Sequence, residues 1–188
     1  EEVGAEAPVP AILGRVAGNP GLAIEGTRVR FAPELIDGCV REYRERVAEA
    51  DNPPRDFLID ILSGYAFQIH DLDADALRPM TTADCIETAK LVDTLRDEGV
   101  LGGTPGMPQD APVACREVLA YKIGCEYCRT SSDVGITSLA AAEAVYEMAQ
   151  VMGRPFGLPM FVLDPLRIEG DAVNIALDFT DNGRPLPL

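Results

Sequence analysis

The chain has 188 residues, of which 47% are hydrophobic and 25% are charged, so it can bury an ordinary globular core. Its formal net charge of −15 argues against a nucleic-acid-binding surface, which needs clustered Lys and Arg. No apolar run is long enough to span a membrane, and the acidic start EEVGAEAPVP does not resemble a signal peptide. Together with five scattered cysteines, these features predict a cytoplasmic protein with reduced thiols.

The first 80 residues are predicted to form a small α+β front segment. Alternating apolar residues at 22–31, with a turn at Glu25-Gly26, predict a β-hairpin. Pro33 is a favourable first residue for the helix that follows, because its missing N–H has no partner there anyway. The stretch DFLIDILSGYAFQIHD predicts two further short strands around Ser63-Gly64, followed by the polar turn DLDADA. This segment therefore reads as an antiparallel cap with one helix.

From Thr81 onward, helices and strands are predicted to alternate. Thr81 with Asp84 forms a capping-box pattern, and Gly99 is a helix terminator. A strand VLGGT follows, and Asp110 is predicted to cap the next helix. EYCRTSSD is predicted as a strand and loop, before a helix that starts at Thr137 or Ser138 and closes at Gly153. The remaining elements are a strand LPMFVL, a loop DPLR, a helix GDAVNIALDFTDNG and a strand RPLPL.

Regular alternation of this kind predicts a parallel sheet, either a closed eight-stranded barrel or an open doubly wound sheet. No glycine-rich phosphate fingerprint follows a strand, which disfavours the open nucleotide-binding sheet. About four strands are visible, half of what a barrel needs. The expected fold class is therefore α/β: a partial, half TIM-type βα barrel over residues 81–188, preceded by the α+β front segment over residues 1–80. Its exposed strand edges predict a homo-oligomer, and we expect the chain to be a piece of a longer protein.

In a barrel of this kind, ligands bind where strands end and βα loops begin. Three loops supply candidate ligand-facing side chains: Thr104, Gln109, Asp110, Ser131, Ser132, Asp164 and Arg167. Each also has a structural interpretation, since Asp110 can serve only as a helix cap and Arg167 can pair with a neighbouring carboxylate. Gly103 and Gly106 can serve only tight turns.

Two further features offer chemistry but specify no reaction. The pair CEYC could supply two thiolates to zinc, yet a structural zinc site needs four ligands and the sequence has no second pair. A redox dithiol would want its first cysteine at a helix N-terminus, whereas this pair follows a predicted helix. His70, the single histidine, could act as a general base, but without a nucleophile partner a structural role is favoured. We predict no directly bound metal.

Four stretches together resemble the trimethylamine methyltransferase family, including its non-pyrrolysine members: GTRVRFAPELI, YAFQIHDLDADALRPMTTADCIETAKLVDTL, PQDAP and DPLRIEGDAVNIALDFTDNGRPLPL. The resemblance implies a TIM-type barrel that moves a methyl group from a methylated or quaternary amine, such as trimethylamine or glycine betaine. The acceptor would be a corrinoid (cobalamin) carried by a separate partner protein. The resemblance covers scaffold segments and identifies no catalytic residue.

Family members are longer than this chain, so the chain alone is expected to be inactive. Two alternatives remain open. One is a catalytically degenerate binding or regulatory domain of the same family. The other is a different TIM-barrel enzyme, a lyase or decarboxylase.

Overall fold

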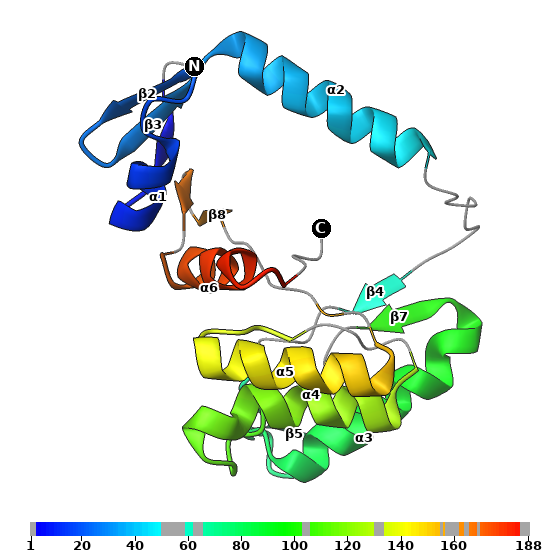
Figure 1. The fold of residues 1–188 in the computed structure, drawn as a ribbon. Helices are drawn as coiled ribbons and strands as arrows, with labels where there is room; N and C mark the ends of the chain where they lie inside the picture. The colour runs from blue at the N-terminus through cyan, green and yellow to red at the C-terminus, as the bar shows by residue number, and fades with distance from the viewer. Residues whose placement is uncertain are drawn as a thin grey trace. The chain divides into compact units, whose positions relative to one another are not determined.

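The computed structural model describes residues 3–49, 59–61, 66–102, 106–129, 134–154, 156, 162–163, 166–168 and 170–184 (Figure 1). The chain divides into two compact units. The first comprises Glu1–Arg55 with Met160–Asp178, and the second comprises Asp56–Pro159 with Phe179–Leu188. Both units mix helices with short strands, which confirms the α/β class. The predicted division into a front segment and a barrel at residue 80 stays a prediction.

The first unit contains a mixed sheet built from short strands. Its order is β2 (Leu22–Glu25), β3 (Arg28–Phe31), β1 (Ala5–Glu6), β9 (Arg167–Ile168) and β8 (Val162–Leu163). The hairpin of β2 and β3 is confirmed, with Leu22 opposite Phe31 and Glu25 opposite Arg28. β1 runs antiparallel to β3 and parallel to β9, and the Glu6 amide donates to the Leu166 carbonyl at 2.8 Å. An N-terminal strand and a strand near residue 167 therefore share one sheet.

Three helices accompany this sheet along the chain: α1 (Pro10–Val16), α2 (Pro33–Glu49) and α6 (Gly170–Asp181). α2 begins at Pro33 as predicted, and α6 confirms the helix predicted in its stretch, whereas α1 was not predicted. The boundary between the two units falls inside α6, after Asp178.

The second unit contains a parallel strand pair, β4 (Ile59–Ile61) and β7 (Val100–Gly102), with Ile59 opposite Val100. Between them along the chain lie the hairpin of β5 (Gln68–Asp71) and β6 (Ala76–Pro79), then α3 (Thr82–Leu95) and a short 3-10 turn (Arg96–Glu98). The strands and the helix thus form a β4–α3–β7 crossover, the elementary unit of parallel βα folds. Figure 1 shows β4 and β7 side by side.

The predicted pairing of the two strands around Ser63-Gly64 is wrong. β4 pairs in parallel with β7, and β5 pairs antiparallel with β6 across the stretch predicted only as a polar turn. The Asp71 carboxylate closes that turn by accepting the amides of Asp73 and Ala74, each at 3.1 Å. Asp75 adopts a φ of 48°, a left-handed conformation that Asp tolerates better than most residues. Local turn chemistry therefore forms the hairpin at the predicted polar turn and not around Ser63-Gly64.

α3 begins as predicted, but it ends at Leu95, and a 3-10 turn continues to the predicted terminator Gly99. The Thr81 hydroxyl accepts the Asp84 amide at 3.3 Å, and the Asp84 carboxylate accepts the Thr81 amide at 2.8 Å, which completes the capping box. Gly99 ends the following turn with a φ of 85°. Two more helices follow: α4 (Arg116–Tyr127), preceded by a 3-10 turn (Val113–Cys115), and α5 (Leu139–Met152). Ser138 caps α5 and Gly153 closes it, again as predicted.

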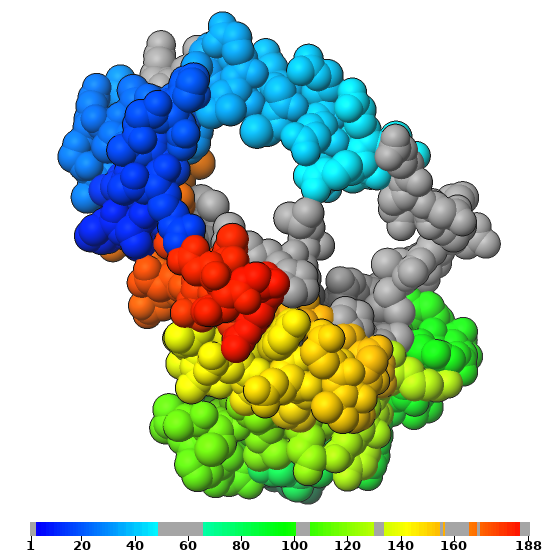
Figure 2. Space-filling view, viewed as in Figure 1, coloured from blue at the N-terminus to red at the C-terminus, as the bar shows by residue number. Residues whose placement is uncertain are grey.

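The predicted strand at EYCRTSSD is wrong at its first residues, because Glu126 and Tyr127 belong to α4. Arg154 explains the extra helical length: its guanidinium donates to the carbonyl oxygens of Cys125 and Cys128, at 3.3 and 3.4 Å, which the helix end leaves without partners. The described residues between α4 and α5, 128–129 and 134–138, contain no strand. Figure 2 shows α4 and α5 side by side, in direct contact.

The second unit has a small core between α3 and α4. Its buried members are Met80, Cys85, Ala89, Val92, Ile123 and Cys128. A separate aromatic cluster joins α5 to the end of α6, where Phe179 stacks on Phe156 at 5.5 Å and meets the Tyr146 ring edge-on at 5.6 Å. Among the described helices, none combines the length and apolar character needed to cross a membrane.

Candidate functional site

The segments that follow the two parallel strands meet at one place. The amide of Met107, after β7, donates to the carbonyl of Ala66, after β4, at 2.9 Å. The Gln109 amide donates to the Met80 carbonyl at 2.7 Å, and the Met80 amide donates to the Phe67 carbonyl at 3.0 Å. Because the carboxyl ends of parallel strands lie at the same edge of a sheet, these bonds join the two loops at the edge where βα folds bind ligands.

An open pocket of about 640 Å³ lies at this junction. It is lined by Phe67, Gln68, Leu77, Pro79 and Gln109. Phe67 is 52% exposed and Leu77 is 65% exposed, so the lining presents an aromatic ring and an aliphatic side chain to solvent. The pocket thus combines apolar surface with two side-chain amides, a composition suited to a small organic ligand.

Gln109 is held in a fixed orientation. Its Nε2 donates to the Met107 carbonyl at 2.8 Å, and its Oε1 accepts Nη1 of Arg116 at 2.8 Å. Arg116 also donates to the main-chain carbonyls of Gln109 and Ala111, at 2.9 and 3.0 Å. A charged side chain therefore positions the amide of Gln109, which the sequence predicted as a ligand-facing residue.

Gly106 allows the loop after β7 to approach the loop after β4. Its φ is +121°, and a Cβ at this position would collide with Met80 and lie 3.1 Å from the Ala66 carbonyl oxygen. The side chain of any other residue would therefore displace the Met80 side chain and press on the Ala66 carbonyl. Of the two glycines assigned to tight turns, Gly106 has a clear structural need, and Gly103 lies outside the described residues.

The sequence predicted that Asp110 caps α4. In the structure, Asp110 instead caps the start of α3. Its Oδ1 accepts the Thr82 amide at 2.8 Å and the Thr82 hydroxyl at 2.9 Å. These hydrogen bonds from Thr82 lower the pKa of Asp110, so the carboxylate stays ionised near neutral pH. Asp110 thereby ties the loop after β7 to a helix that begins 28 residues earlier.

A charged network adjoins Asp110 at the same helix end. Arg78 on β6 binds both carboxylate oxygens of Asp84, at 2.6 and 2.8 Å, and its Nε donates to Asp71 at 3.2 Å. The bidentate contact with Arg78 holds the pKa of Asp84 well below its usual range, against a smaller opposing effect of burial. The pKa of Asp71 is also lowered, first by the Ala74 amide and then by Arg78. The hairpin is thus fastened to the start of α3.

These contacts limit the chemistry of the site. Asp71, Asp84 and Asp110 are all held as hydrogen-bonded carboxylates with lowered pKa values, whereas a general acid or base near neutral pH needs a pKa close to 7. The residues that line the pocket are aromatic, aliphatic or amide in character. These three carboxylates are therefore committed to contacts that hold the hairpin and the loop after β7 in place, and the lining itself offers aromatic, aliphatic and amide groups.

The structure brings two of the seven sequence-predicted site residues together, the neighbours Gln109 and Asp110. Arg167 lies in β9 of the other unit, on a strand rather than in the predicted loop, because that segment extends the sheet alongside β1. Four predicted residues lie outside the described part of the chain: Thr104, Ser131, Ser132 and Asp164.

The cysteine pair is not part of this pocket's lining, whereas His70 lies opposite the lining residue Leu77 and shares a face of the hairpin with Leu77 and Gln68. Cys125 is inside the last turn of α4 and Cys128 caps that helix, and both are buried. Burial raises the pKa of the Cys125 thiol, so it resists ionisation. His70 lies on β5, where its Nε2 is 3.2 Å from the Asp75 carboxylate across the hairpin turn. Within the described residues, no group of three or more His, Cys, Asp or Glu side chains could hold a metal ion.

Sequence reasoning missed Phe67, Gln68, Leu77 and Pro79, because the hairpin was assigned to the front segment rather than to a βα loop. One signal was present: FLIDIL is a nearly continuous apolar run, which is typical of a buried parallel strand. Had β4 been placed in the parallel pair, the residues that follow it would have become candidate ligand-facing positions.

A scan of the chain against protein-family models finds no match, and a search of curated proteins finds none either. The function is therefore argued from the site and from the sequence resemblance.

Proposed function

We propose that this chain supplies part of a TIM-type βα barrel that takes a methyl group from a methylated or quaternary amine and passes it to a corrinoid on a separate partner protein. One observation carries the proposal. The loops after two parallel strands converge on a pocket that contains Gln109, at the strand edge where βα barrels bind substrates. The sequence resemblance supplies the reaction, and the β4–α3–β7 crossover supports the proposal because such crossovers are the units from which βα barrels are built.

The pocket suits a methylated ammonium ion. Such a cation carries its charge inside a shell of methyl groups, so it needs apolar contact and a favourable electrostatic field rather than many hydrogen bonds. Phe67 offers a ring face, and Leu77 and Pro79 offer aliphatic surface. The ionised Asp110 adjoins Gln109 in the chain and offsets the positive charge of Arg116, which donates to the Gln109 amide.

The chain's own task would be positioning. The amide of Gln109, fixed by Arg116, would orient the polar end of the amine, and the apolar lining would exclude water around the methyl group to be moved. A reduced corrinoid supplies a cobalt nucleophile for the methyl group when the partner is bound. The resemblance implies that the partner protein carries the corrinoid, so the proposal assigns the amine to this chain.

Isothermal titration calorimetry of the chain with trimethylamine, glycine betaine and choline tests the binding step. We expect at least one amine to bind, and Phe67→Ala and Gln109→Ala to weaken it about tenfold each, which corresponds to about 1.4 kcal/mol. Val113→Ala is the matched control, because Val113 is 75% exposed and outside the pocket lining. If all three amines fail to bind, or if Val113→Ala weakens binding as much as Phe67→Ala, the proposed site is wrong.

A second experiment tests the reaction. The full-length source protein is mixed with a reduced corrinoid protein and the amine that binds, and methyl-cobalt formation is followed by its absorbance. Formation of methyl-cobalt supports the enzyme. Binding without methyl transfer would favour the alternative, a degenerate binding or regulatory domain. None of the described lining residues is ionisable, which is compatible with that alternative.

A further inference from the structure

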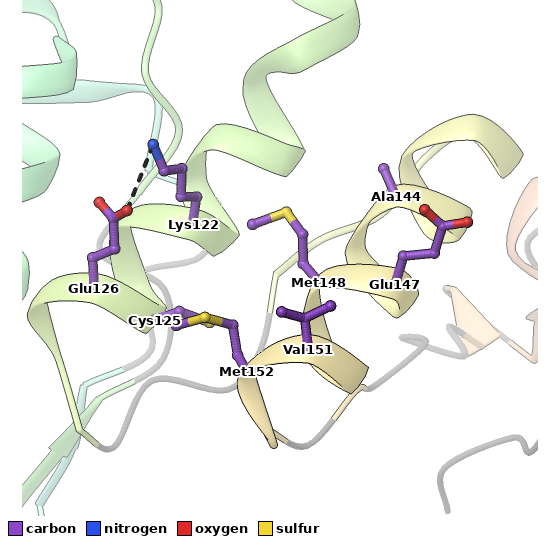
Figure 3. A pocket seen from close by; sticks show the side chains of 8 residues that line it. All are labelled: Lys122, Cys125, Glu126, Ala144, Glu147, Met148, Val151 and Met152. Atoms are coloured by element: carbon purple, nitrogen blue, oxygen red, sulfur yellow. Dashed lines mark ion pairs between the residues drawn. The ribbon is translucent and has the colours of Figure 1, made fainter.

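A groove of about 430 Å³ lies between α4 and α5 and is separate from the pocket described above (Figure 3). Its lining residues are Lys122, Cys125, Glu126, Ala144, Glu147, Met148, Val151 and Met152. Met148 and Met152 extend from α5 toward α4, and Val151 is 86% exposed. We call this surface the α4–α5 groove. Methionine-rich apolar grooves of this kind accept helices, because the flexible thioether side chain adapts to its partner.

A matching helix is present in the same sequence. α2 carries Ile36, Val40, Tyr43 and Val47 at spacings of four, three and four residues, which place all four on one face. These side chains are between 41% and 62% exposed, although the face is as apolar as a core-facing helix. We call this face the α2 stripe. Helical spacing places Arg44 and Arg46 on its two flanks, with Asp37 on the same side as Arg44.

The two surfaces are complementary in charge as well as in character. The α4–α5 groove carries Glu126 on α4 and Glu147 on α5, one acidic residue on each of its walls. Glu126 is partly neutralised by Lys122, whose Nζ lies 3.5 Å away, and Glu147 adds acidic charge on the opposite wall. A helix laid in the groove with an apolar face inward and an arginine on each flank would place each arginine beside one of these carboxylates.

We propose that the α2 stripe of one copy docks in the α4–α5 groove of a second copy, and the reverse, to form a two-fold symmetric dimer. The stripe and the groove belong to different compact units of the chain, so each copy presents both halves of the contact. Two-fold symmetry makes the same contact twice. Doubling matters, because it adds buried area toward the roughly 800 Å² per partner that stable interfaces bury.

Disulfide crosslinking between two different variants tests the contact and its direction. One chain carries Tyr43→Cys and the other carries Val151→Cys, and both carry Cys39→Ser and Cys115→Ser to remove the exposed thiols. We expect mixed disulfide dimers under mild oxidation. A chain with Leu72→Cys in place of Val151→Cys is the control, since Leu72 is 84% exposed in the hairpin turn. The proposal is overturned if mixed dimers are no more abundant than in this control. It is also overturned if a chain that carries both Tyr43→Cys and Val151→Cys forms an internal disulfide.

Charge reversal gives an independent measure by sedimentation velocity. Arg44→Glu and Glu147→Arg should each raise the dimer dissociation constant roughly tenfold, and the two together should restore it to within roughly threefold of the original. Arg41→Glu makes the same charge change on the side of α2 away from the stripe, and it should have little effect. A chain that sediments as a monomer at every concentration, or single reversals without effect, would refute the dimer. These readouts do not depend on amine binding, so they stand apart from the proposed function.

Discussion

Gly106 offers a sharp test of how the candidate site is built, because its replacement by alanine should strain the junction between the two loops. A φ of +121° is open almost only to glycine, and holding another residue there costs about 1–3 kcal/mol. The new methyl group would also overlap Met80, and overpacking of this kind costs about 1–3 kcal/mol. We expect Gly106→Ala to lower the free energy of unfolding by about 3 kcal/mol in total.

Urea unfolding measures this loss. The sequence has no tryptophan, so tyrosine circular dichroism is the tertiary probe, with far-ultraviolet dichroism beside it. With a urea dependence of about 2 kcal/mol per molar, the midpoint should fall by about 1.5 M. Gly153→Ala is the matched control in the same unit. Its φ of +61° is also left-handed, but a Cβ there meets nothing within 4 Å, so its midpoint should fall by only about 0.5 M. Equal shifts for the two variants would refute the close approach of the loops.

Two further predictions concern the second unit. Arg129 binds the Asp93 carboxylate and lowers its pKa to about 2 from 3.8, so this contact stabilises the fold above about pH 4 and its contribution disappears as the pH falls toward 2. Urea midpoints measured from pH 7 to pH 2 should therefore fall more steeply for the natural chain than for Asp93→Asn, and parallel curves would contradict this. Phe179 is fully buried in the aromatic cluster, so Phe179→Ala should lower the free energy of unfolding by about 3–5 kcal/mol in the same assay. Phe67→Ala, at an exposed ring, should lower it by less than about 1 kcal/mol. Similar losses for the two variants would contradict the burial of Phe179.

Elements set by local contacts could be predicted from the sequence. The capping box of Thr81 and Asp84 spans three residues, and Gly153 needs only its own left-handed conformation to close α5. The hairpin of β2 and β3 follows from alternation around a tight turn. In each case the residues that decide the structure are neighbours in the chain, so a short window of sequence contains the whole interaction.

Elements set by distant contacts were missed. α4 runs through Tyr127 because Arg154, well beyond the helix, caps its last carbonyls. Asp110 caps α3 rather than α4. Its hydrogen-bond partner Thr82 lies 28 residues earlier, so no short window of sequence contains both residues. β4 pairs with a strand some 40 residues later, and no local pattern specifies the partner of a parallel strand.

The residues of the candidate site show the same difference between local contacts, which could be predicted, and distant contacts, which could not. Gln109 was predicted from its position after a strand, and the structure places it in a pocket. Phe67 was not predicted as part of a site, because its role depends on a hydrogen-bonded junction between segments about 40 residues apart. Sequence therefore identified one side of the pocket, and the pairing of β4 with β7 was needed to identify the other.

The charged and uncharged residues of this region have separate tasks. Arg78 binds Asp84 and so fixes the hairpin to the start of α3. Asp110 binds Thr82 and so fixes the loop after β7 to the same helix end. Phe67 and Gln109 then face a pocket whose walls are already in place. The described lining therefore supplies aromatic, aliphatic and amide contacts, and His70, opposite Leu77, places an ionisable group on the same face of the hairpin.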